Sequence, residues 1–146
     1  YPDREEELQI LEANANVSVL HEANPVVDSE VIHRSRKLID GIYLDNKLKA
    51  YLVDVVLAPR DPASCGASEL AAFIRFGASP RATISLALAS KAVAFMQGRS
   101  FVTPQDIKDV GLDVLRHRVI VSYEAEAESV SSDDVIKKIF ETVPVP

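Results

Sequence analysis

Hydrophobic residues recur at helical spacing along most of the 146-residue chain. In the clearest case, after Asp45 and before Pro59, the apolar stripe consists of Leu48, Tyr51, Leu52, Val55 and Val56. Acidic or hydroxyl residues stand where such patterns begin, and Gly or Pro where they end, as is typical of helix termini. The pattern predicts about six helices, over residues 3–13, 28–40, 45–58, 79–97, 103–116 and 131–142.

The fourth predicted helix, over residues 79–97, is apolar on nearly every side. Its hydrophobic residues include Ile84, Leu86, Leu88, Ala89, Ala92, Val93, Phe95 and Met96. Because alanines let other helices approach closely, such a helix is typical of the middle of a helical domain. We expect it to form the core.

Three segments depart from helical spacing. The segment 119–123 is short and rich in β-branched residues, which favours a strand. Pairing with residues 100–102 would make a two-stranded ribbon. Residues 60–78 carry Pro and Gly around an apolar stretch that fits either a turn of helix or a short strand. Because connections this long are uncommon unless they bind something or lack order, we interpret 60–78 as a functional loop. Residues 14–27 have no sustained period and predict an irregular connection.

The expected fold class is therefore mainly α, a helical bundle-like arrangement with a minor short β ribbon. The length fits one domain over residues 1–146. Because the chain begins with Tyr1 and not with Met, we expect it to be part of a longer protein with any catalytic motif upstream.

Charge and apolar content argue against several classes of protein. The net charge of −6 disfavours a nucleic-acid binder, and we interpret the basic residues within 33–37, flanked by acids, as a solvated surface. No apolar run is long enough for a membrane-spanning helix, and the N-terminus does not resemble a signal peptide. We expect a soluble, cytoplasmic protein without membrane insertion.

Residues able to bind metals or cradle phosphates are scattered. The lone Cys65 has no neighbouring base or ligand pair, and His21, His33 and His117 lie in three separate segments, so we expect no metal site. The five glycines do not form the Gly-rich loop that holds a nucleotide in ATP-hydrolysing proteins. We expect no catalytic residue in this chain alone.

The segment around Arg81 combines two features that attract anions. Ser79 and Pro80 mark the start of the fourth helix, where backbone N–H groups and the positive end of the helix dipole lie. Arg81 projects from this first turn, and its planar guanidinium can grip phosphate oxygens. We interpret Gly77 as permitting a tight approach and Pro80 as stiffening the entry. The alternative is a surface ion pair between Arg81 and an acid such as Glu69.

Several stretches, in order along the chain, also form a recognisable set. They are Tyr1-Pro2 with the glutamates 5–7, residues 77–82, residues 98–107, residues 114–119, and the ending 143–146. This set resembles the C-terminal lid of MoxR-type AAA+ ATPases, relatives of the magnesium-chelatase ATPase subunit. The resemblance covers nearly the whole chain. One departure is Pro59, which stands before Arg60 where the family more often has threonine.

The resemblance implies that ATP and Mg lie between an ATPase core and this lid in the full-length protein, with neither bound by this chain alone. Arg81 would contact the terminal phosphate as the second-sensor arginine. Gly77, Ser79 and Pro80 would position it, and Tyr1 and Pro2 would form the linker near the nucleotide. The resemblance further implies a homo-oligomeric ring, commonly a hexamer, and chaperone-like remodelling of a client protein, for example one with a von Willebrand A-type domain.

Two other functions stay open. One is a helical protein-interaction domain with no nucleotide role, which grips a partner through residues 60–78 while Arg81 is only structural. The other is a helix-turn-helix nucleic-acid module, which the net charge of −6 disfavours.

Overall fold

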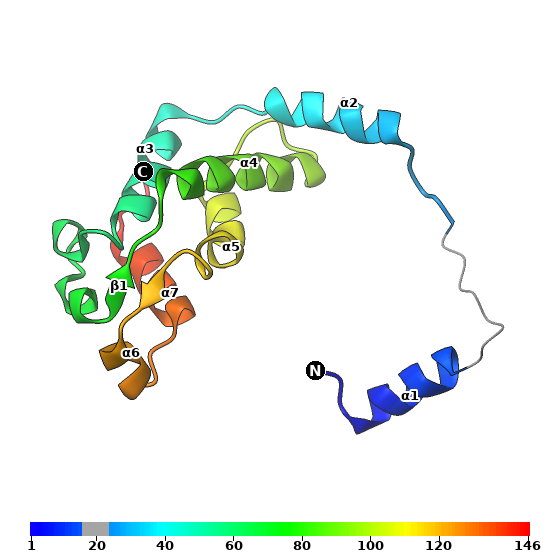
Figure 1. Cartoon of the computed structure of the whole chain (residues 1–146). Helices are drawn as coiled ribbons and strands as arrows, with labels where there is room; N and C mark the ends of the chain where they lie inside the picture. Colours follow the sequence, from blue (N-terminus) through cyan, green and yellow to red (C-terminus); the bar gives the residue numbers. More distant parts are fainter. Residues whose placement is uncertain (16–23) are drawn as a thin grey trace. The chain divides into compact units, whose positions relative to one another are not determined.

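A computed structural model describes residues 1–15 and 24–146 (Figure 1). The chain divides into two compact units, residues 1–32 and residues 33–146, and each is considered separately below. His21 and most of the predicted irregular connection 14–27 lie outside the described residues. One lid domain over residues 1–146 stays a prediction.

The first unit contains helix α1 (Arg4–Asn14), at the position that the sequence predicts. A capping box starts the helix, because the Asp3 carboxylate accepts from the N–H groups of Glu5 and Glu6 while the Asp3 N–H donates to the Glu6 carboxylate. No residue of α1 is buried. Its apolar side chains Leu8, Ile10 and Leu11 are exposed.

Helix α2 (Ser29–Asp40) spans the boundary between the two units and also matches its prediction. Asp28 caps it, since its carboxylate accepts from the Val31 N–H at 2.8 Å. The basic residues predicted to be solvated are all exposed: His33, Arg34, Arg36 and Lys37.

Four helices build the core of the second unit: α3 (Asn46–Leu57), α4 (Pro80–Met96), α5 (Pro104–Leu115) and α7 (Ser132–Thr142) (Figure 1). Helix α4 packs against α3 and α5, and α5 packs in turn against α7. The largest fully buried side chains come from all four: Tyr51, Leu52, Val55, Val56, Leu86, Ile107, Leu115, Val135, Ile136 and Ile139. Each such side chain contributes about 1.5–3 kcal/mol by leaving water. The mainly α class is therefore confirmed.

Helix α4 lies in the core as expected, and only one of its faces is fully buried, although its apolar residues lie on nearly every side. The buried residues recur every four positions and are Ala82, Leu86, Ser90 and Ala94. On other faces Ile84 is 63% exposed, Leu88 52% and Met96 74%. Apolar composition predicts that a helix can be enclosed, but whether neighbours cover every face depends on the whole arrangement.

A two-stranded β ribbon exists as predicted, but the predicted partner strand, residues 100–102, is wrong. Strand β2 (Ile120–Val121) lies antiparallel to β1 (Ile74–Phe76), with Ile74 opposite Val121 and Phe76 opposite Ile120. Residues 100–102 meet Tyr43 in an isolated bridge instead. The segment predicted as strand 119–123 also ends early, because Ser122 caps an additional short helix, α6 (Tyr123–Ala127).

Residues 60–78 are folded, with two short 3₁₀ helices preceding β1. These are η1 (Pro62–Cys65) and η2 (Ser68–Ala72), and Gly66 between them has φ +85°, a left-handed conformation that favours glycine. Ala67 and Leu70 are buried in the core. The apolar stretch 70–74 therefore contains both a helical turn and the start of a strand.

A buried ion pair holds the start of α5. The Asp106 carboxylate is 2% exposed and binds the Arg99 guanidinium at 2.5 Å and 2.8 Å. It also accepts from the backbone N–H and the hydroxyl of Thr103, as part of a capping box at the start of α5. Burial raises the pKa of Asp106, but the hydrogen bonds from Arg99 and Thr103 outweigh it, so the pKa lies below its ordinary value of 3.8.

Candidate functional site

The predicted anion-contact residues join β1 to α4. Ser79 is the N-cap of α4 in an extended conformation, and Pro80 is the first helical residue. Ala78 is buried, whereas Arg81 in the first turn is exposed. The structure therefore presents the guanidinium of Arg81 to solvent at a helix start, as the sequence predicts.

No side chain of the described residues caps the start of α4. Ser79 makes no capping hydrogen bond, and the first turn contains no acidic residue. The N-caps of α1, α5 and α7, which are Asp3, Thr103 and Ser131, all form capping boxes. The positive end of the α4 dipole therefore has no acceptor side chain from the described part of its own chain.

Gly77 is needed here because another part of the chain approaches it closely. A Cβ atom at Gly77 would lie 2.7 Å from Cγ of Arg60 and 2.9 Å from the carbonyl carbon and oxygen of Pro59. No side chain fits in that space. The tight approach expected at Gly77 is therefore made by the residues that follow α3.

Arg60 fastens the same segment through its head group. Its Nε–H donates to the carbonyl oxygen of Ala78 at 2.5 Å, across eighteen residues of sequence. The contact fixes the backbone immediately before Ser79 and hence the direction in which α4 begins. The sequence contained no local signal for this role, because the two partners are brought together only by the fold.

The side chain of Arg81 has no ion pair or hydrogen bond with the described residues. The alternative pairing with Glu69 is wrong, since Glu69 faces Lys138 instead, with Oε1 and Nζ 4.0 Å apart. The guanidinium of Arg81 is therefore available for a ligand.

A second arginine lies near the first turns of α4. Arg118 follows α5, and its Nε–H donates to the carbonyl oxygen of Val114 at 2.8 Å. Its Nη2 lies 3.5 Å from Oγ of Ser85, which is four residues after Arg81 on α4. The sequence marked residues 114–119 as a family signature but predicted no role for Arg118.

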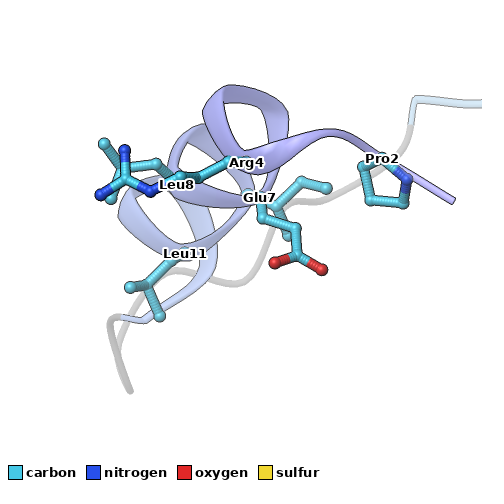
Figure 2. A pocket seen from close by; sticks show the side chains of 6 residues that line it. Pro2, Arg4, Glu7, Leu8 and Leu11 are labelled. Atoms are coloured by element: carbon cyan, nitrogen blue, oxygen red, sulfur yellow. The ribbon is translucent and has the colours of Figure 1, made fainter.

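Tyr1 and Pro2 belong to the first unit and are exposed. Figure 2 shows a pocket along α1, lined by Pro2, Arg4, Glu7, Leu8, Ile10 and Leu11. All of its lining residues belong to the first unit. A position of Tyr1 and Pro2 near a nucleotide stays a prediction.

Metal ligands are not clustered within residues 1–15 and 24–146, where no group of three His, Cys, Asp or Glu residues is placed to hold an ion. In the same residues, no helix is both long and apolar enough to cross a membrane.

Comparison with known proteins agrees with this architecture. The profile of the AAA lid domain family matches residues 67–139. Chaperone MoxR1 of Mycobacterium tuberculosis is 33% identical over all 146 residues, which cover 38% of that protein. Protein MoxR of Paracoccus denitrificans is 37% identical over 112 residues, covering 73% of this chain and 33% of that protein. The crystal structure of a Cytophaga hutchinsonii protein, assigned by inference as an ATPase, matches with a TM-score of 0.88 and 36% identity.

The chain therefore belongs to the AAA lid domain family, and its relatives identify it as a lid of the MoxR type. It spans less than half the length of these relatives, and all of it aligns with 44% of the Cytophaga hutchinsonii structure.

Proposed function

We propose that this chain is the lid of a longer MoxR-like AAA+ ATPase and that Arg81 contacts the terminal phosphate of ATP. The nucleotide would lie mainly on an ATPase core outside this chain, and the lid would close on it through the start of α4. The position of the lid would then depend on whether the terminal phosphate is present.

The observation that carries this proposal is the unpaired guanidinium of Arg81 at an uncapped helix start. An arginine is unfavourable in a first helical turn, because it faces the positive end of the dipole. No contact with the described residues compensates for this position. The alternative in which Arg81 is only structural pairs it with an acid of its own domain, and no described acid pairs with it, which favours the nucleotide role.

The surrounding residues are suited to positioning Arg81. The hydrogen bond from Arg60 to Ala78 and the close packing at Gly77 hold the backbone rigidly up to Ser79. A fixed backbone limits the region that the Arg81 guanidinium can reach, which reduces part of the entropy lost when it binds phosphate oxygens. Charge building up on a transferring phosphoryl group is stabilised most by cations already in place.

The ATP would bind with Mg, and we assign both to the full-length protein and neither to this chain alone. The relative named Chaperone MoxR1 supports a further proposal, in which the full-length protein remodels a client protein. A homo-oligomeric ring, commonly a hexamer, is a proposal that follows from the family resemblance. A client with a von Willebrand A-type domain and a cytoplasmic location are expectations from the family resemblance.

The proposal is tested by ATP affinity in the protein that carries this chain together with its ATPase core. Arg81→Ala should weaken ATP binding by about tenfold or more, because a charge-assisted hydrogen bond to phosphate is lost. Arg75→Ala is the control, since Arg75 is an exposed arginine whose guanidinium lies over the rings of Phe76 and Tyr123. Equal ATP affinity in wild type and Arg81→Ala would refute the phosphate contact.

A further inference from the structure

The end of α5 lies beside the beginning of α4 in the second unit. The Nη2 atom of Arg118 is 3.5 Å from Oγ of Ser85, and Ser85 stands one helical turn after Arg81. Residues four apart on a helix share a face. Arg118 therefore reaches the face of α4 from which Arg81 projects.

Arg118 is half-buried, and it forms no ion pair with any described residue. Among the described residues, its side chain binds the neutral oxygens of Val114 and Ser85. By contrast, Arg116 pairs with Asp113 and Asp133. Removing a guanidinium partly from water without a nearby negative charge is unfavourable, and a bound anion would compensate for it.

None of the salt bridges among the described residues involves Arg81 or Arg118. Helix α4 contains no acidic residue over its whole length, and its charged residues are Arg81 and Lys91. The nearest acid of α5 in sequence, Asp113, is held by Arg116, and Asp109 accepts from Gln105. Neither arginine is therefore neutralised by a salt bridge with a described residue.

We propose that Arg118 is a second phosphate-binding cation, which acts beside Arg81 on the terminal phosphate of the same nucleotide. The inference rests on the proposed function of Arg81. The bond from Nε to Val114 uses one edge of the guanidinium and orients the group, while Nη1 keeps its hydrogens free of described partners. Two arginines that approach one phosphate from α4 and from the end of α5 would also tie the packing of these helices to nucleotide state.

The hydrogen bond from Arg118 to the Val114 carbonyl oxygen would also form if Arg118 only capped the end of α5. The test must therefore separate the effect of the Arg118 charge on ATP binding from its effect on helix packing. The experiment uses the protein with its ATPase core and measures dissociation constants for ATP and ADP. The variants are Arg118→Met, which removes the charge and keeps the length, Arg81→Ala, and Ser85→Ala as the packing control.

Arg118→Met should weaken ATP binding by about tenfold while ADP binding changes by less than about threefold. Ser85→Ala should retain both affinities. An equal loss for ATP and ADP, an equal loss in Ser85→Ala, or no loss at all would overturn the role of Arg118. If Arg81→Ala weakens ATP binding and Arg118→Met does not, the inference fails and the proposed function stands; if Arg81→Ala has no effect, the proposed function itself fails.

A second measurement needs no variant and so remains decisive if Arg118→Met does not fold. The arginine reagent phenylglyoxal is applied to the wild-type protein with ATP, with ADP or without nucleotide, and modified arginines are located by mass spectrometry. ATP should slow the modification of Arg118 several-fold more than ADP does. Equal modification of Arg118 under the three conditions would contradict the proposal.

Discussion

The Nε–H of Arg60 donates to the carbonyl oxygen of Ala78, with 2.5 Å between nitrogen and oxygen. This bond joins the end of α3 to the residue before the N-cap of α4. Because Ala78 is buried, its carbonyl oxygen depends on protein partners for its hydrogen bonds. The contact makes Arg60 the residue that holds the arginine-bearing helix start in place.

Arg60→Gln should therefore reduce the free energy of unfolding by about 2 kcal/mol, because a buried acceptor loses its partner. It should also speed amide hydrogen exchange in the first turn of α4. The check is urea unfolding of the chain together with exchange measured by mass spectrometry. Arg75→Gln, on the exposed strand β1, should cost less than about 1 kcal/mol and leave that turn unchanged. Equal effects of the two substitutions would show that Arg60 has no special anchoring role.

Two N-cap serines should respond differently to the same substitution. Ser131 accepts from the Asp134 N–H and closes a capping box, whereas Ser79 makes no capping bond. Ser131→Ala should cost about 1 kcal/mol of stability, and Ser79→Ala less than about 0.5 kcal/mol. Thermal unfolding of both variants checks this difference. A cost of about 1 kcal/mol for Ser79→Ala would mean that its hydroxyl caps α4 after all.

Gly111 lies where α5 packs against α7. A Cβ atom there would stand 2.3 Å from the ring of Phe140, so the ring must move in Gly111→Ala. We expect a loss of about 1–3 kcal/mol, even though alanine favours the helical conformation over glycine. The smaller side chain in Phe140→Leu should relieve the clash. The double variant should therefore be more stable than the sum of the two single losses predicts, as a double-mutant cycle in urea would measure; strict additivity would argue against the clash.

Asp106 should make the chain sensitive to acid. Its pKa is lower in the folded chain than its ordinary value of 3.8, so its contribution to stability is complete above about pH 5 and is lost as the pH falls further. Asp106→Asn should lose about 2 kcal/mol at pH 7, because Arg99 loses its partner but stays partly solvated. The variant should also lose less stability than wild type between about pH 5 and pH 3. Parallel urea titrations that give the same pH dependence for both proteins would contradict this role.

The sequence predicted those features that depend on neighbouring residues. The capping boxes at Asp3, Thr103 and Ser131 start their helices where expected, because a cap and its helix lie within four residues of each other. Pro80 likewise marked the start of α4 correctly.

Features that depend on distant residues were missed or mistaken. The strand at Ile120 pairs with β1 and not with residues 100–102, because Tyr43 already occupies the latter. The roles of Arg60 and Arg118 depend on contacts made across the fold, with Ala78 and Ser85. The exposed face of α4 could not be foreseen either, since hydrophobic spacing does not show which neighbours cover a helix.

The most direct test of the central claim is the rate of ATP hydrolysis by the protein that carries this chain and its ATPase core, with Arg81 replaced by Ala. The account predicts a rate at least about tenfold below wild type, because a cation placed at the transferring phosphate is removed, with Arg75→Ala close to wild type. A wild-type rate of hydrolysis in Arg81→Ala would contradict it.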